Sequence, residues 1–257
     1  MEVFKNIMIK AIHIIESITS THITVQPKSR IKVHPNAISD GSSMKTYVSL
    51  VNKFANFEVR NIFEIGANYA QDADFLRKSF NVNPENVYVF EPHPQIFDEI
   101  KRNFTFNVFD YAVSNTPGRT TFNAIDLLNN VYRNSGISSL RDGLTTDPKN
   151  FLKVEVDLIR MDDFMLTHGI ESIDFLKVDV EGMNYEVLEG FGEFLPQVKA
   201  IQTEGEYKQY WEGQRLYQQM HDLLIKNHFR LIYFALSADG IQSDSFWINE
   251  KFVKTAN

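Results

Sequence analysis

The strongest constraint on the fold is a regular alternation of short β-forming runs with helix-like segments after Pro35. Strands that alternate with helices in this way form parallel sheets joined by crossover helices. The sequence therefore predicts an α/β fold around a mostly parallel sheet. The runs expected to be strands are 60–66, 86–92, 106–113, 153–161, 172–182, 198–205, 229–236 and 244–253, and the expected helices are 72–80, 94–103, 185–190 and 216–227.

Composition limits the number of domains and the kinds of partner. A chain of 257 residues that is 43% hydrophobic can bury a large core, so we expect one domain with an N-terminal extension. The formal net charge of -7 gives no overall attraction to nucleic acid, so no nucleic-acid partner is expected and a small or neutral substrate is favoured. The chain has no cysteine, which excludes disulfides and thiolate metal sites.

Residues 1–57 are expected to form an N-terminal helical extension, and residues 58–257 the main domain. Charged residues interrupt every apolar run near the N-terminus, so we expect neither a signal peptide nor a transmembrane segment, and a cytoplasmic location. Apolar residues at helical spacing predict an amphipathic helix that packs on the domain or on a second subunit, making a homo-oligomer possible; binding to a membrane surface is the alternative. The stripe consists of Phe4, Ile7, Met8, Ala11, Ile12, Ile15 and Ile18.

The stretch FEIGANYAQDADF, residues 63–75, joins the first expected strand to a helix. Ligands of open parallel sheets bind beyond the carboxyl ends of the strands, and Gly66 supplies backbone torsions that larger residues avoid. Glu91 ends the second expected strand and can accept both hydroxyl hydrogens of a ribose. Because the turn has a single glycine, it favours a nucleoside without phosphates, such as S-adenosylmethionine, over a dinucleotide. An ordinary strand-to-helix turn is the alternative.

A second informative stretch is DFLKVDVEG, residues 174–182. In a strand, Lys177, Asp179 and Glu181 share one face, and three ionisable groups are buried there only when they pair or meet a polar ligand. One interpretation is an ion pair from Lys177 to Asp179 or Glu181. The favoured interpretation places both carboxylates beside the reacting groups, where they orient an acceptor hydroxyl or take its proton. Glu204 ends the next strand and supplies a third carboxylate at the same edge.

Four stretches together resemble the FkbM-type methyltransferases: FEIGANYA, VYVFEPHPQIF, DYAVSNTPGRTTF and IDFLKVDVEGMNYEVLEGF. The resemblance covers residues 61–252, and LKVDVEG matches the K-x-D-x-E-G signature of that family. It implies the class I methyltransferase fold, with a mostly parallel seven-stranded sheet, and S-adenosylmethionine as cofactor. Two positions depart from the family pattern. Ala70 replaces a glycine, for which we expect a right-handed backbone, and Asn184 stands where the family often has glutamate.

The same resemblance implies roles for individual residues. It places one set around the methionine part of the cofactor, Glu91 on the ribose, Pro92 and His93 beside the adenosine, and a further set at the adenine. Asp179 and Glu181 are expected beside the sulfonium, because the first strand and the strand before these carboxylates should be neighbours. The methionine set is Glu64, Gly66, Ala67 and Asn68, and the adenine set is Asp110, Tyr111, Ala112 and Val113.

The reaction that these features imply is O-methylation of a sugar, glycan or glycosylated small molecule. Its expected catalytic residues are Lys177, Asp179, Glu181 and Glu204. The last three carboxylates could hold a hard cation, but a hydrogen-bonded acceptor site is preferred and no metal is expected. An NAD-dependent oxidoreductase and a catalytically silent nucleoside-binding module are the alternatives.

Two further stretches are expected near the acceptor. The polar residues 123–149 are predicted to form a loop that closes over the acceptor, with Ser138 and Ser139 in it. Tyr207, Tyr210 and Trp211 form either an aromatic wall for the acceptor or core packing.

Overall fold

The computed structural model describes residues 42–129, 132 and 134–255. The amphipathic helix predicted within residues 1–20, with its expected role in a homo-oligomer, lies outside the described residues. Within these described ranges, no helix is long and apolar enough to cross a membrane.

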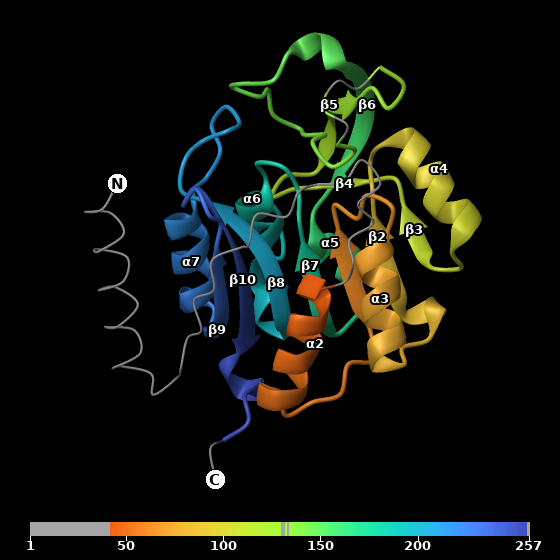
Figure 1. Cartoon of the computed structure of the whole chain (residues 1–257). Helices are drawn as coiled ribbons and strands as arrows, with labels where there is room; N and C mark the ends of the chain where they lie inside the picture. Colours follow the sequence, from red (N-terminus) through yellow and green to blue (C-terminus); the bar gives the residue numbers. More distant parts are fainter. Residues whose placement is uncertain (1–41, 130–131, 133, 256–257) are drawn as a thin grey trace.

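A seven-stranded sheet forms the centre of the molecule (Figure 1). All neighbouring pairs are parallel except those of β10, which runs antiparallel to both β8 and β9. The mostly parallel seven-stranded sheet expected from the sequence is therefore confirmed. In spatial order the strands are β3 (Asn107–Phe109), β2 (Val87–Phe90), β1 (Ile62–Ile65), β7 (Ile173–Val178), β8 (Val198–Glu206), β10 (Gln242–Asn249) and β9 (Phe229–Leu236).

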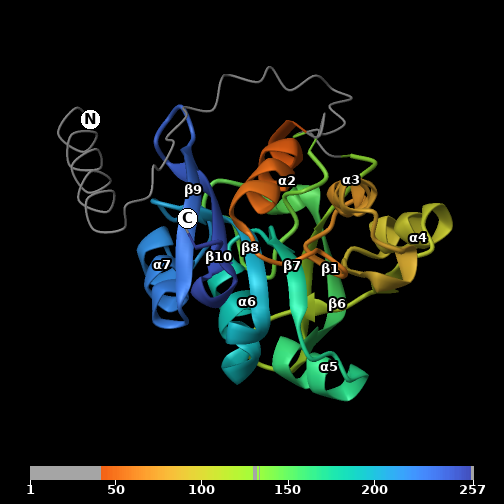
Figure 2. The same cartoon turned by 90° about the horizontal axis from the view of Figure 1, so that it is seen from below.

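Helices cover both faces of this sheet, and Figure 2 shows α2 and α3 on one side with α5 and α6 on the other. Each layer has its own apolar core, because the strands are buried on both faces. The first layer contains α2 (Ser42–Phe54), α3 (Gln71–Phe80) and α4 (Pro94–Asn103), and the second contains α5 (Met161–His168), α6 (Asn184–Glu189) and α7 (Tyr217–Lys226). Four 3-10 turns, η1 to η4, span Pro84–Asn86, Pro148–Asn150, Gly192–Gln197 and Glu250–Phe252.

Helix α2 packs directly on the sheet although it precedes residue 58. The ring of Tyr47 lies 5.6 Å from that of Phe246 and 6.0 Å from that of Tyr233, centroid to centroid. Tyr47 is almost fully buried, with 2% of its surface exposed. The core of the sheet thus includes part of the expected extension, and the domain boundary at residue 58 stays a prediction.

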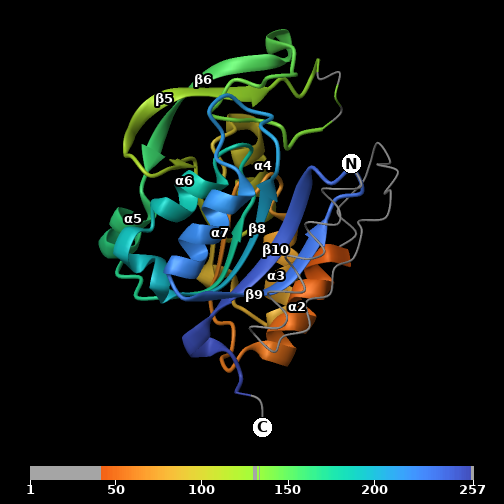
Figure 3. The ribbon, with the colours of Figure 1, turned by 90° about the vertical axis from the view of Figure 1, so that its left-hand side faces the viewer.

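A second, three-stranded sheet stands beyond the carboxyl ends of the main strands, as Figure 3 shows for β5 and β6. It has the order β4 (Ala112–Val113), β6 (Phe151–Ile159) and β5 (Gly118–Ile125). Strand β6 is parallel to β4 and antiparallel to β5. We call residues 118–129, 132 and 134–159 the arm.

Two expectations from the sequence are wrong in the region of the small sheet. The run 106–113, expected to be one strand, is broken at Asp110 and Tyr111, so that β3 joins the main sheet and β4 joins the small one. The polar stretch expected from residue 123 begins inside β5, which the sequence analysis did not identify. Its first residues are mostly exposed and polar, and only its last four are buried, so it lacks the alternation expected of a half-buried strand.

Candidate active site

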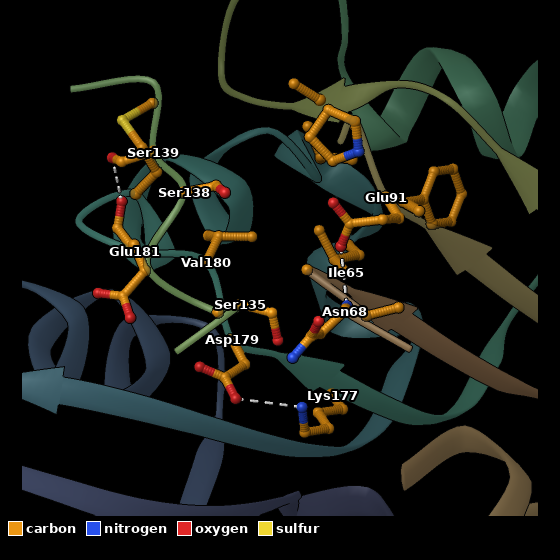
Figure 4. Close-up of a pocket in the computed structure, with 18 of the residues that line it drawn as sticks. Ile65, Asn68, Glu91, Ser135, Ser138, Ser139, Lys177, Asp179, Val180 and Glu181 are labelled. Carbon is orange, nitrogen blue, oxygen red and sulfur yellow. Dashed lines mark hydrogen bonds and ion pairs between the residues drawn. The ribbon is translucent and has the colours of Figure 1, made fainter. Parts of the chain in front are cut away.

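A cavity of about 450 Å³ opens at the carboxyl ends of β1, β2, β7 and β8, beneath the arm (Figure 4). This is the edge where parallel α/β sheets bind their ligands. One half of the lining comes from the turns after β1 and β2 and from the start of β4: Ile65, Gly66, Ala67, Asn68, Tyr69, Gln71, Asp72, Phe90, Glu91, Pro92, Tyr111, Ala112 and Val113. The other half comes from β7, β8, β10 and the arm: Lys177, Asp179, Val180, Glu181, Met183, Glu204, Gln242, Phe122, Asn134, Ser135, Gly136, Ser138, Ser139 and Leu140.

The turn after β1 depends on a glycine. Gly66 has a φ of +78°, in the left-handed region that favours glycine. A Cβ atom at this position would lie 2.2 Å from the carbonyl oxygen of Asp179. Because Gly66 has no side chain, the turn after β1 packs closely against the turn after β7. These two turns form adjacent parts of the cavity wall.

The prediction of a right-handed backbone at Ala70 is wrong. Ala70 has φ 55° and ψ 27°, and it precedes α3 in the left-handed conformation. Asn68 also has a positive φ, of 48°. Ala70 thus adopts a backbone conformation that glycine reaches more readily, where the chain reverses between β1 and the start of α3. The alanine side chain is fully buried there.

Glu91 holds the turn from the other side. Its Oε2 accepts a hydrogen bond from the Asn68 amide at 2.8 Å, and its Oε1 accepts one from the His93 amide at 2.9 Å. Burial raises the pKa of Glu91 to about 7, although both amides favour the ionised form. A carboxylate has about four acceptor positions, so each oxygen keeps one for a ligand hydroxyl.

The remaining residues expected at the cofactor divide into two groups. Pro92, Ala67 and Ala112 line the cavity. Glu64, His93 and Asp110 are not among its lining residues. Glu64 is 1% exposed and binds the Ala73 amide at the start of α3, at 3.0 Å, whereas Asp110 is exposed just after β3.

Lys177 is the centre of a buried ion-pair cluster. Its Nζ lies 3.1 Å from Glu64 Oε1, 3.3 Å from Asp72 Oδ2 and 3.1 Å from Asp179 Oδ2. The lysine side chain is 5% exposed, and these carboxylates raise its pKa although desolvation acts against the charged form. Burial raises the pKa of Glu64 to about 7. The ion pair that the sequence left as one interpretation is thus present with Asp179, while Asp179 still lines the cavity.

Glu181 lies in a different environment from Asp179. Strand β7 ends at Val178, so both carboxylates belong to the following turn and their directions are not set by strand alternation. Glu181 Oε2 accepts a hydrogen bond from Trp211 Nε1 at 3.1 Å. Burial, and then the negative charges of Asp179 and Glu206, raise the pKa of Glu181 to about 8. This raised pKa suits Glu181 to act as a base near neutral pH.

Glu204 completes this side of the cavity, and the side chain of Asn184 binds two of the segments that form it. The Glu204 carboxylate accepts a hydrogen bond from Gln242 on β10. Asn184 receives the Val180 amide at 2.9 Å on its Oδ1 and donates to the Glu204 carbonyl at 3.2 Å. Asn184 therefore joins the turn after β7 to the end of β8, which gives this departure from the family pattern a structural role.

The arm supplies several lining residues that sequence reasoning placed only loosely. Ser138 and Ser139 were expected near the acceptor, and both line the cavity. Phe122, Met183 and Gln242 were missed, because only the tertiary fold brings them to this edge. Asp72 was missed too, although its position in the first turn of α3, directly after the glycine loop, was a usable signal.

Tyr207, Tyr210 and Trp211 are not among the lining residues. The alternative of packing therefore holds over the aromatic wall, and Trp211 is 4% exposed beneath Gly182.

The carboxylates do not form a metal site in the part of the chain that the structure describes. Among residues 42–129, 132 and 134–255, no three histidine, cysteine, aspartate or glutamate side chains are grouped so that they could hold an ion.

Comparison with known proteins gives a consistent family. The Methyltransferase FkbM domain matches residues 64–231. The chain is 27% identical over 245 residues to "2-O-methyltransferase NoeI" of Sinorhizobium fredii, covering 88% of each chain. It is 28% identical over 163 residues to "Methyltransferase sdnD" of Sordaria araneosa, covering 51% of this chain and 60% of that one. Among solved structures, the FkbM methyltransferase of Methylobacillus flagellatus aligns with a TM-score of 0.48 at 13% identity, covering 74% of this chain and 44% of that chain.

Proposed function

Because the chain belongs to the FkbM family of S-adenosylmethionine-dependent methyltransferases, we propose that it methylates a hydroxyl group of a sugar, glycan or glycosylated small molecule. The observation that carries this proposal is the division of the cavity. Glu91 and the Gly66 turn form one half, and the carboxylates Asp179, Glu181 and Glu204 gather in the other. The similarity to a protein described as a 2-O-methyltransferase supports oxygen as the methyl acceptor.

The first half of the cavity fits S-adenosylmethionine. Glu91 would bind the ribose hydroxyls with the acceptor positions that the two backbone amides leave open. The Asn68 Oδ1 atom is buried without a hydrogen-bond partner and would accept from a donor on the cofactor. Pro92 and Ala112 would flank the adenine. When bound, the cofactor supplies an electrophilic methyl group on a positively charged sulfur.

The second half of the cavity fits a neutral hydroxyl acceptor. Lys177 is already surrounded by three carboxylates, so we assign it the task of holding Asp179 and the start of α3 rather than stabilising an alkoxide. Asp179, which pairs with Lys177, would accept a hydrogen bond from the acceptor and orient it. Glu181 would take the proton of the hydroxyl that is methylated, because its raised pKa suits a proton acceptor near neutral pH.

Water exclusion is the other contribution of the chain. The arm residues Ser135, Gly136, Ser138, Ser139 and Leu140 line the same cavity as the carboxylates, and exclusion of water there would strengthen hydrogen bonds to the acceptor. Positioning of the hydroxyl can supply much of the rate in a direct displacement.

The test of this proposal is a binding experiment with two cofactors. Calorimetric titration should show saturable binding of S-adenosylhomocysteine and none of NAD. Subsequent addition of neutral oligosaccharides to the S-adenosylhomocysteine complex should give a second binding event, weakened in the Asp179→Asn variant. Binding of NAD in place of S-adenosylhomocysteine would overturn the cofactor assignment, and the absence of any saccharide binding would overturn the acceptor class.

A further inference from the structure

The arm forms hydrogen bonds to two successive carbonyl groups of the turn that carries Glu181. Ser139 Oγ donates to the Glu181 carbonyl at 2.6 Å, a contact drawn in Figure 4. Arg141 Nε donates to the next carbonyl, that of Gly182, at 3.0 Å. The two donors are themselves connected, because the Arg141 amide donates to Ser139 Oγ at 3.0 Å. The backbone that directly follows the Cα atom of this glutamate is thus held by the arm.

The guanidinium of Arg141 also binds two other segments. Its Nη1 donates to the Glu212 carbonyl at 2.9 Å, and its Nη2 donates to Glu186 Oε1 on α6 at 2.7 Å. The side chain of Arg141 is 20% exposed and that of Glu186 is 9% exposed, so this ion pair is largely removed from water. A planar guanidinium presents its donors in fixed directions, and lysine cannot reproduce three such contacts at once.

Arg141 therefore ties the backbone of Glu181 to the segment that binds its carboxylate. Trp211, which donates to Glu181 Oε2, precedes the Glu212 carbonyl held by Arg141. The arm pairs with the same segment through backbone hydrogen bonds on both sides of Trp211: Leu144 donates to the Tyr210 carbonyl at 2.8 Å, and the Glu212 amide donates to the Asp142 carbonyl at 2.9 Å.

We infer that Arg141 is a positioning residue for Glu181, which it holds between the arm and Trp211 in the orientation and dry surroundings that proton transfer from the acceptor requires. The part of this inference that concerns catalysis rests on the proposed function. The part that concerns the surroundings of Glu181 does not.

The sign of the expected effect follows from burial, which outweighs the charged groups around Glu181. Asp179 on the same turn and Glu206 on β8 both repel its ionised form, and Trp211 Nε1 stabilises it. The largest contribution to its raised pKa is burial. If Arg141 is removed, the arm and the Trp211 segment separate more easily and water reaches the carboxylate, so the pKa of Glu181 should fall toward its ordinary value.

The experiment is a pH titration of Glu181 in the full chain, labelled with carbon-13 at the glutamate carboxyl and followed by NMR. The resonance is assigned by its absence in Glu181→Gln. Wild type should titrate at about 8, and Arg141→Met should titrate at least about one unit lower. Arg141→Lys should fall between them. Arg119→Met is the matched control, because Arg119 is on the same arm, 68% exposed, and 4.0 Å from Asp157.

A second variant keeps the inference testable if Arg141→Met does not fold. Ser139→Ala removes the contact to the Glu181 carbonyl and leaves the Arg141–Glu186 ion pair in place, and it should shift the titration in the same direction. Unchanged titration of Glu181 in folded Arg141→Met or Ser139→Ala would overturn the inference. If the titration shifts as expected but no saccharide is methylated, the proposed function fails and the positioning of Glu181 stands.

Discussion

The ammonium of Lys177 lies 3.1 Å from Glu64 Oε1, and both side chains are removed from water, with 5% and 1% of their surface exposed. This pair joins β7 to β1, since the two residues are register partners in the sheet. Asp72 and Asp179 complete the cluster, and both of them line the cavity. The lysine of the K-x-D-x-E-G motif thus connects the cofactor half of the site to the acceptor half.

Replacing Lys177 should therefore act chiefly on stability. Lys177→Met leaves buried Glu64 without its cation, and breaking a buried ion pair typically costs about 3–5 kcal/mol. Urea unfolding of Lys177→Met should show a loss of this size. Lys78→Met, which removes an exposed partner of Asp74, should change the unfolding free energy by less than about 1 kcal/mol. A Lys177→Met protein of normal stability that transfers methyl groups slowly would instead assign the lysine to the chemistry.

Gly66 should be intolerant of any side chain. Gly66 and Gly169 both have positive φ, but a Cβ at Gly66 meets the Asp179 carbonyl at 2.2 Å, whereas a Cβ at Gly169 has nothing within 4 Å. The left-handed conformation alone costs alanine about 1–2 kcal/mol. Gly66→Ala should lose at least about 2 kcal/mol more than Gly169→Ala in urea unfolding, and its affinity for S-adenosylhomocysteine should fall. Equal losses in the two variants would show that the turn after β7 can move away.

Glu91 should make cofactor binding depend on pH. Its pKa is raised to about 7 by burial, so it ionises as pH rises through 7 and then accepts hydrogen bonds from ribose hydroxyls most strongly. The affinity for S-adenosylhomocysteine should increase between pH 6 and pH 8. Hydrogen bonds to charged groups are worth about 1.5–3 kcal/mol, so Glu91→Gln should bind at least about tenfold more weakly at pH 8 and lose much of the pH dependence.

Calorimetry at both pH values measures these effects. Glu85→Gln is the control, because Glu85 is an exposed glutamate in η1. Wild-type affinity in Glu91→Gln at pH 8 would remove Glu91 from the cofactor site.

Glu181 should control the rate of methyl transfer through its ionisation. A base acts in its ionised form, and burial raises the pKa of Glu181 to about 8, so the rate should rise between pH 6 and pH 9 with a midpoint near 8. Glu181→Gln should lower kcat by about 10²–10⁴ and abolish this rise, while S-adenosylhomocysteine affinity stays close to wild type. Glu206→Gln removes a repelling charge and should move the rise to lower pH. A pH profile that persists in Glu181→Gln would assign the proton transfer to another group.

The parallel sheet was predictable because its central strands are buried on both faces and appear in the sequence as short apolar runs bounded by helical segments. Lys177, Asp179 and Glu181 were identified for the same reason, since charged residues at the end of such a run are unusual. Their division of roles was not predictable. It depends on Glu64 and Asp72 converging on Lys177 and on Trp211 reaching Glu181, contacts that span long sequence separations.

Only part of the arm could be predicted from the sequence. The run 153–161 was expected to be a strand and corresponds to β6, whereas β5 was missed because it buries only its last four residues and lacks the alternation of a half-buried strand. The left-handed backbone at Ala70 was missed because alanine rarely adopts it, and the sequence alone does not show how sharply the turn before α3 must bend.

The measurement that tests the central claim most directly is product analysis after incubation with S-adenosylmethionine carrying a carbon-13 methyl group. Neutral oligosaccharides and glycosylated small molecules are supplied in parallel, and each product is examined by mass spectrometry and NMR. The account predicts transfer of the labelled methyl group to a sugar hydroxyl, seen as a methyl ether carbon coupled to a ring proton, with the yield strongly reduced in Glu181→Gln. Transfer to nitrogen or carbon, or equal yields from wild type and Glu181→Gln, would contradict it.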